Sequence, residues 1–188
     1  MEFNIVYFFN RLGQGTYVDQ ITAFISLIPF LIVLWAVLAF TAFFVDKKNG
    51  KWVLIAVLIA LALHFIISEG LLKHAILTFF PPRIRPWIGH PGEIIAIGKA
   101  FTDSSFPSSH MASALAVLTV FVTFYRKTWP LALIFVLLMA FSRIHNGMHY
   151  PTDVLAGTVL GLGYGLLAIY IVNKIRAKFT NKLRSIDN

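Results

Sequence analysis

A polar stretch overlaps the ends of two apolar segments in this chain: Ser142-Arg143-Ile-His-Asn-Gly-Met-His149-Tyr-Pro-Thr-Asp153. The apolar segments run over about residues 131–148 and 152–172. Each is close to the roughly 20 helical residues that a bilayer core requires. The stretch therefore predicts a turn between two membrane helices. It places an arginine, a histidine and a carboxylate at helix ends, where a membrane protein has little structural reason to keep them.

The composition supports a membrane protein. Of the 188 residues, 58% are hydrophobic and only 13% are charged, and the mean hydropathy is +0.77. These values are far from those of a soluble domain. Three further apolar segments lie near residues 21–45, 52–72 and 108–125. We therefore predict an all-α, polytopic integral membrane helix bundle with about five transmembrane helices.

The same pattern divides the chain into three parts. Residues 1–20 mix apolar and polar side chains and are predicted to form an N-terminal interfacial segment, helical over about residues 3–12. Residues 21–172 are predicted to form the transmembrane domain, in which Pro29 favours a kink in the first helix. Residues 173–188 are predicted to form a basic cytoplasmic tail.

The net charge of +8 is concentrated in short clusters between the apolar segments. Membrane orientation explains such clusters better than nucleic-acid binding does. With five crossings, the basic connections at 46–51 and 126–130 share one side with the tail, and the positive-inside rule makes that side cytoplasmic. The 73–107 connection and the 144–151 turn then face outward. The chain has no cysteine, which excludes disulfides, thiolate metal sites and cysteine nucleophiles.

A small-residue pattern marks the last apolar segment. Gly157, Gly161 and Gly165 are spaced at four, which lets helices approach closely in lipid. Tight packing within the bundle is the preferred interpretation, and homodimerisation is the alternative.

The polar residues predicted at the outer ends suit phosphoryl transfer. Arg85 and Arg143 can contact phosphate through planar, multidentate guanidinium groups, and the helix that opens at Pro107-Ser108-Ser109-His110 offers unpaired backbone N–H groups to an anion. A carboxylate at Asp153 can accept a hydrogen bond from one nitrogen of His149 and leave the other nitrogen neutral and able to attack. His110 is then the candidate acid.

These fragments resemble the motifs of the type-2 phosphatidic-acid phosphatase superfamily. The family pattern Ser-Arg-x5-His-x3-Asp is matched in full from Ser142 to Asp153, and Pro-Ser-Gly-His is matched at 107–110 with Ser109 in place of glycine. Of the first motif, Lys-x6-Arg-Pro, only Arg85-Pro86 is present. The resemblance spans about residues 52–172. It implies that His149 is the nucleophile, Asp153 its partner and His110 the acid. It further implies phosphate binding by Arg85, Arg143, Ser108 and Ser109, with no metal or cofactor.

The lysine of the first motif would fall at position 78, where Thr78 stands. Lys73 could replace it if the intervening segment loops out, and Arg83 could supply the charge from nearby. The alternative for Lys73 is a helix-end ion pair with Glu69, four residues earlier. Both basic residues therefore remain candidate phosphate ligands.

Two other histidines have open roles. His145 follows Arg143 by two residues and could line the same pocket, although an ordinary loop histidine is the preferred interpretation. His64 lies in the middle of the second apolar segment, where a neutral imidazole bonded to a neighbouring helix is expected.

Small size and an outward-facing site resemble the bacterial undecaprenyl-diphosphate phosphatases. The expected activity is hydrolysis of a lipid phosphate or diphosphate, through a phosphohistidine, at the outer face of a bacterial plasma (inner) membrane. Phosphatidylglycerophosphate, phosphatidate and lipid A phosphate remain alternative substrates, because pocket shape decides among them. A membrane transport protein, or one that binds haem or a metal through its histidines and arginines, is the hypothesis from another class.

Overall fold

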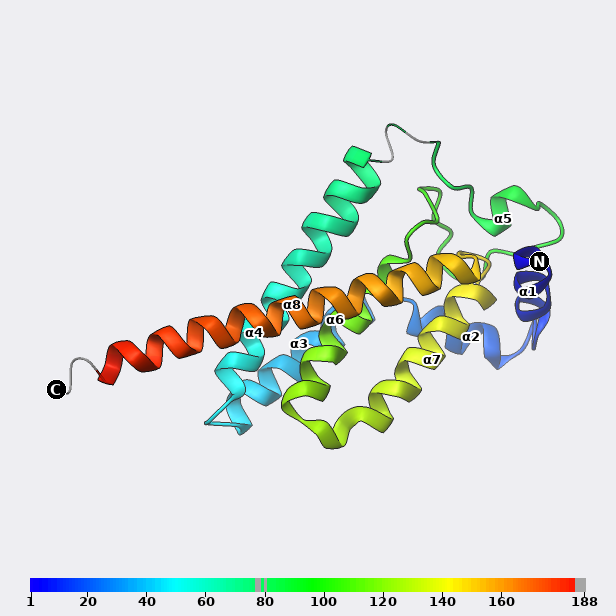
Figure 1. Ribbon diagram of the computed structural model, residues 1–188. Coiled ribbons are helices and arrows are strands. Elements are labelled where there is room, and N and C mark those ends of the chain that lie inside the picture. Colours follow the sequence, from blue (N-terminus) through cyan, green and yellow to red (C-terminus); the bar gives the residue numbers. More distant parts are fainter. Residues whose placement is uncertain (77–78, 80, 185–188) are drawn as a thin grey trace.

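The computed structural model describes residues 1–76, 79 and 81–184, and all the regular structure in this part of the chain is helical (Figure 1). The elements are α1 (Glu2–Arg11), α2 (Tyr17–Ile25), α3 (Ile28–Val45), α4 (Gly50–Leu63), the π-helix η1 (His64–Ile76), α5 (Pro86–Gly89), α6 (Ser109–Phe124), the 3₁₀ turn η2 (Arg126–Thr128), α7 (Trp129–His145) and α8 (Pro151–Arg184).

Among the described residues, four helical stretches are long and apolar enough to cross a membrane: Ile28–Val45, Gly50–Lys73, Arg126–His145 and Pro151–Asn181. The remaining apolar helix, α6, has only 16 residues. Most of its side chains are buried, so α6 lies inside the bundle and is covered by its neighbours. The predicted all-helical membrane fold is confirmed, and the count of five crossings is approximate because α6 is short.

The first predicted segment is two helices rather than one. The segment 21–45 is divided at Ser26 and Leu27 between α2 and α3. Pro29 lies in the first turn of α3, where its missing N–H is tolerated because no helical partner is required there. The effect of Pro29 is therefore a helix start rather than the kink predicted from the sequence.

Both ends of the chain are more helical than the pattern indicated. The N-terminal segment contains α1 and the start of α2, and Asn10 ties α1 to the bundle by donating to the carbonyl of His145 at 2.6 Å and to that of Ile95 at 2.8 Å. At the other end, α8 continues to Arg184. The described part of the predicted tail is therefore a continuation of the last helix.

The glycines of α8 pack against α6. A Cβ added at Gly161 would collide with the backbone oxygen of Ala112 and lie 2.7 Å from the Cβ of Leu115. Gly157 and Gly165 meet α6 in the same way. The spacing of four thus serves the close α6–α8 contact within the bundle, as preferred from the sequence, and this contact occupies the face that a homodimer would have used.

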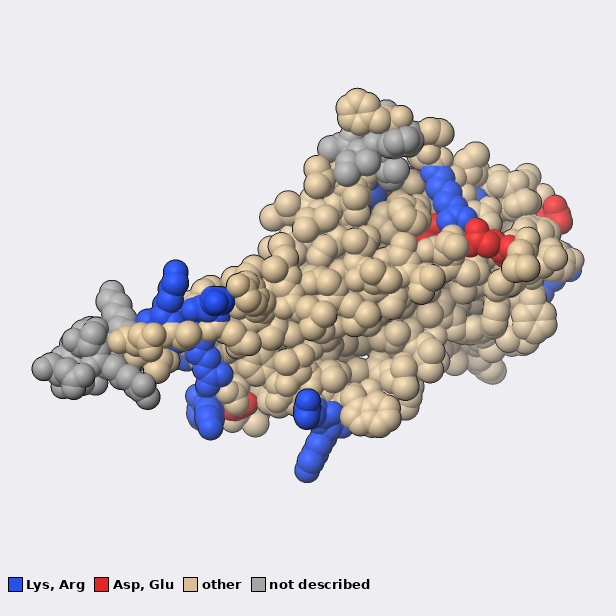
Figure 2. Space-filling model, viewed as in Figure 1, with Lys and Arg blue, Asp and Glu red and all other residues tan. Residues whose placement is uncertain are grey.

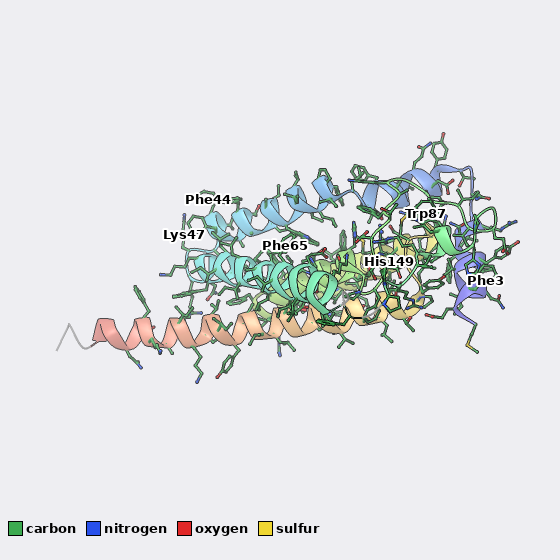
Figure 3. All side chains as sticks on the ribbon, turned by 90° about the horizontal axis from the view of Figure 1, so that it is seen from above. Phe3, Phe44, Lys47, Phe65, Trp87 and His149 are labelled. Carbon is green, nitrogen blue, oxygen red and sulfur yellow. The ribbon has the colours of Figure 1, made fainter. Side chains whose placement is uncertain are left out.

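Charged side chains gather toward the two ends of the molecule, with a broad uncharged band between them (Figure 2). Lys47 lies at one end, and His149 lies toward the other end, where Trp87 and Phe3 are also found (Figure 3). We call these the Lys47 end and the His149 end. The lysines of the 46–51 connection are thus separated from the predicted site by the length of the helices.

Candidate functional site

A cavity of about 640 Å³ extends from the His149 end into the apolar band. Its lining changes character along its length. One part is polar and is lined by Glu69, Lys73, Arg85, Asp103, Ser109, His110, Arg143 and His149. The other part lies between α3 and α4 and is lined mainly by apolar side chains, among them Leu31, Trp35, Ala36, Ala39, Val57 and Leu61.

His149 follows the α7–α8 turn and is almost completely buried. Its Nδ1 lies 2.7 Å from the backbone oxygen of Ser105, so Nδ1 carries the proton and donates it to that carbonyl. Nε2 is then the nitrogen with the free electron pair, and it lies 3.4 Å from a terminal nitrogen of Arg85. Burial, followed by the charges of Arg143 and Arg85, lowers the pKa of His149 well below 6.5, which favours the neutral ring.

Arg85 is buried and held by several acceptors. Its Nε donates to the carbonyl of Asp103 at 2.9 Å, and one terminal nitrogen donates to the carbonyl of Met148 at 3.0 Å. The other terminal nitrogen donates to the carboxylate of Asp103 at 2.7 Å and to the carbonyl of Ser104 at 3.3 Å. These bonds fix the guanidinium beside the Nε2 of His149.

Arg143 and His110 complete the polar wall. The guanidinium of Arg143 is 1% exposed, and within the described residues its Nε and one terminal nitrogen have no hydrogen-bond partner. A buried guanidinium with unpaired N–H groups is costly, so an anion bound in the cavity would stabilise it. His110 lies in the first turn of α6, and its Nε2 lies 3.0 Å from the carbonyl of Ser26. Because the Nε2–H donates to this carbonyl, Nδ1 is the nitrogen of His110 that can gain or lose a proton.

Asp153 is placed differently from expectation. One of its oxygens lies 3.7 Å from the Nδ1 of His149, too far for a hydrogen bond, and the Nδ1–H donates to the carbonyl of Ser105 instead. The carboxylate instead accepts from the backbone N–H of Tyr150 at 2.8 Å and pairs with Arg83 at 2.6 Å. Asp153 is fully buried, and at this distance its carboxylate lies near the imidazole without accepting a hydrogen bond from it.

Of the two candidates for the missing cation, only Lys73 lines the cavity. It belongs to the π-helix, and its Nζ lies 3.4 Å from Glu69 and 3.1 Å from Asp103. Arg83 faces away from the cavity, where it pairs with Asp153 and Glu2 and lies over the ring of Tyr150. The proposal of Arg83 as a phosphate ligand is therefore not supported by its position, and Thr78 lies outside the described residues.

The two serines at the start of α6 also differ in position, because only Ser109 lines the cavity. Ser108 is buried behind the cavity wall, and its N–H donates to the carbonyl of Asp153 at 3.1 Å, so that group is not available to an anion as expected. Ser109 lines the cavity, and its hydroxyl donates to Glu69. No non-glycine residue in the described part of the chain has a positive φ. Serine therefore replaces the family's glycine at position 109 without backbone strain.

Of the two histidines with open roles, His64 lines the cavity and His145 does not. His145 is buried outside the cavity, where its Nδ1 lies 3.0 Å from the hydroxyl of Thr22 and its Nε2 lies 3.0 Å from the carbonyl of Leu12. It links α7 to the N-terminal helices. His64 lines the cavity, and its buried Nδ1 has no hydrogen-bond partner among the described residues. The hydrogen bond expected between His64 and a neighbouring helix is therefore not formed at Nδ1.

Sequence reasoning missed two groups of this site. The backbone oxygen of Ser105 fixes the orientation of His149, and no side-chain pattern could have indicated a carbonyl. Asp103 contacts two of the candidate phosphate ligands. Burial alone would raise the pKa of Asp103, but the charges of Lys73 and Arg85 lower it overall. An acidic residue shortly before Pro107-Ser-Ser-His110 was the available signal for it.

Comparison with known proteins agrees with this geometry. Residues 51–177 match the model of the PAP2 superfamily. The undecaprenyl-diphosphatase BcrC of Bacillus subtilis is 35% identical over 158 residues, which cover 82% of this chain and 75% of that protein. The lipid A 4'-phosphatase of Bacteroides thetaiotaomicron is 28% identical over 160 residues, covering 78% and 68%.

The fold has a solved counterpart. The crystal structure of LpxE from Aquifex aeolicus superimposes with a TM-score of 0.68 at 20% identity, covering 89% of this chain and 93% of that one. At this identity the likeness shows the fold alone. The family match covers α6, α7, nearly all of α4 and most of α8, and it includes the motifs from Arg85 to Asp153. The chain therefore belongs to the PAP2 superfamily and is a membrane phosphatase.

Proposed function

We propose that this protein hydrolyses a lipid diphosphate, undecaprenyl diphosphate in the first place, through a phosphohistidine at His149. The observation that carries the proposal is the continuity of the cavity, whose polar part holds the histidines and arginines and whose apolar part lies between α3 and α4. A headgroup phosphate and the start of a hydrocarbon chain fit these two parts in that order. The 35% identity to an undecaprenyl-diphosphatase favours a prenyl chain.

In the first step the neutral Nε2 of His149 attacks the terminal phosphorus in line. An N–P bond forms as the bond from phosphorus to the bridging oxygen breaks. Arg85 and Arg143, with Lys73 beside them, hold the equatorial oxygens, whose negative charge must be matched by fixed cations. His110, protonated on both nitrogens, gives a proton to the departing oxygen.

In the second step water releases inorganic phosphate. His110, now neutral, accepts a proton from the attacking water, and the N–P bond to His149 breaks. The buried charge of Asp153 stabilises the positive imidazole ring that forms in the first step. The Ser105 carbonyl holds the ring throughout by accepting its Nδ1–H at 2.7 Å.

We propose that the site faces outward across a bacterial plasma membrane. Support comes from Lys47, Lys48 and Lys51, which lie in and beside the α3–α4 turn, at the opposite end of the helices from His149. Basic connections favour the cytoplasmic side. Residues 21–172 then form the phosphatase domain, α1 lies at the outer interface, and the end of α8 is cytoplasmic.

The test is phosphate release by the purified protein from a panel of lipids, with undecaprenyl diphosphate compared with phosphatidate and phosphatidylglycerophosphate. The proposal expects the highest kcat/KM on the prenyl diphosphate, with inhibition by vanadate. Phosphate release from the glycerol lipids alone would assign the site to that class of substrate.

Chain recognition is tested by filling the apolar part of the cavity. Ala36 lines the cavity on α3, whereas Ala62 on α4 is exposed and lies outside it. Ala36→Phe should lower kcat/KM for undecaprenyl diphosphate more than for short-chain farnesyl diphosphate. Ala62→Phe, the matched control, should change neither. Equal losses on both substrates in Ala36→Phe would argue against a chain lying between α3 and α4.

A further inference from the structure

Asp103 places a carboxylate among the cations of the cavity. One oxygen accepts from Arg85 at 2.7 Å, and the other accepts from the Nζ of Lys73 at 3.1 Å. The side chain is 51% exposed and lines the cavity. Two of the three cations that would hold a phosphate group therefore already share an anion, whereas Nε and one terminal nitrogen of Arg143 have no hydrogen-bond partner within the described residues.

The carboxylate is not needed to hold Arg85 in position. Arg85 also donates to three backbone oxygens, those of Asp103, Ser104 and Met148, at 2.9, 3.3 and 3.0 Å. These bonds would survive replacement of the carboxylate by an amide. The orientation of Arg85 therefore does not require the negative charge of Asp103.

A phosphate at this site would meet that charge directly. Its oxygens need the same N–H groups of Arg85 and Lys73 that Asp103 now uses, and two negative groups a few ångströms apart repel each other. Each bound anion must therefore displace Asp103 from at least one cation. The exposed side of the carboxylate gives it room to withdraw toward solvent.

We propose that Asp103 sets the affinity of the site for phosphate, by exchanging with phosphate oxygens on Lys73 and Arg85 and so keeping released inorganic phosphate weakly bound. This inference rests on the proposed function, because it concerns the same phosphate site. The Asp103 carboxylate offsets part of the positive charge of Lys73 and Arg85 while the site is empty. It returns to them as the product leaves.

The test is the dissociation constant of inorganic phosphate, measured by titration calorimetry on the full chain in detergent. Asp103→Asn keeps the size of the side chain and removes its charge. It should bind phosphate at least about tenfold more tightly than the wild type, a change of about 1.4 kcal/mol, and phosphate should inhibit its turnover more strongly. Asp103→Glu should restore weak binding.

Glu93→Gln is the matched control, because Glu93 is an exposed acid of the same connection that does not line the cavity. Its phosphate affinity should equal that of the wild type. Equal or weaker phosphate binding by Asp103→Asn would overturn the inference and make Asp103 a support for Arg85. If Asp103→Asn does not fold, Asp103→Ser serves as the second uncharged variant, and the same outcomes apply.

The two proposals fail separately. Loss of the proposed function would appear as absence of phosphate release from every lipid by the wild type. Failure of the Asp103 inference would appear as normal lipid hydrolysis with no tightening of phosphate binding in the uncharged variants. Absence of phosphate binding in the wild type and in both uncharged variants would also overturn the inference.

Discussion

The Nδ1 of His149 lies 2.7 Å from the backbone oxygen of Ser105, a full ångström closer than the 3.7 Å that separates it from the carboxylate of Asp153. A carbonyl can only accept, so this contact assigns the proton to Nδ1 and the reactive electron pair to Nε2. The tautomer of His149 is thus set by the backbone of the segment before α6, and it does not depend on the ionisation of Asp153.

The pH dependence follows from the surroundings of His149. Burial, then Arg143 and Arg85, lowers its pKa below 6.5. A nucleophilic imidazole is active above its pKa, so the acid limb that it causes in kcat/KM should lie below pH 6.5 in the wild type. Arg143→Gln removes one depressing charge and should move this limb to higher pH. The substrate ionises alike in both assays, so a limb at the same pH in both proteins would show that it belongs to another group.

The positions of Lys73 and Arg83 predict different kinetic effects. Lys73 lines the cavity, so Lys73→Gln should raise KM and lower kcat/KM by roughly 10- to 150-fold, the scale of a charge-assisted contact of about 1.5–3 kcal/mol. Arg83→Gln removes the partner of the buried Asp153. It should lower the thermal stability and kcat while leaving KM within about twofold. A large KM effect in Arg83→Gln alone would reverse the assignment.

The α6–α8 contact predicts a difference between two glycines of one helix. Gly161→Ala would press a methyl group against the backbone of α6 and should destabilise the protein by about 1–3 kcal/mol. Gly163→Ala has open space around its Cβ and should be neutral, or stabilising by up to about 1 kcal/mol. Thermal unfolding in detergent compares them. Equal losses would mean that α8 does not approach α6 through its glycines.

The orientation can be read with single cysteines, since the chain contains none of its own. Gly89 and Lys48 are both exposed and lie at opposite ends of the helices. Gly89→Cys should react with an impermeant thiol reagent in intact cells, and Lys48→Cys should react only after lysis. The reverse pattern would place the site in the cytoplasm.

The features that could be predicted from the sequence are those set by local composition. The lengths of the apolar segments predicted the membrane helices, and the spacing of the glycines in α8 predicted its packing face. Both could be predicted because hydrophobic burial and small-residue contact act over a few helical turns. The motifs also predicted that Arg85, Arg143, His110 and His149 lie close together, and all four line one cavity.

Contacts between distant segments were not predictable in this way. The ion pair of Arg83 with Glu2 joins residues 81 positions apart, and Ser26, at the break between α2 and α3, contacts His110 of α6 and Ser142 of α7. The π-helical turns that carry Lys73 leave no simple period in the sequence. Backbone acceptors such as the carbonyl of Ser105 carry no side-chain signal at all.

The most direct test of the covalent mechanism is chemical trapping of the intermediate. The wild-type protein is mixed with a diphosphate lipid labelled in the terminal phosphate and is then denatured in alkali, in which phosphohistidine is stable. We predict label on the protein that is lost in acid and that maps to the peptide containing His149. His149→Ala should carry no label, while His110→Ala should gain label more slowly and keep it longer, because both formation of the intermediate and its release to water are slowed. Label of equal amount on His149→Ala would contradict the account.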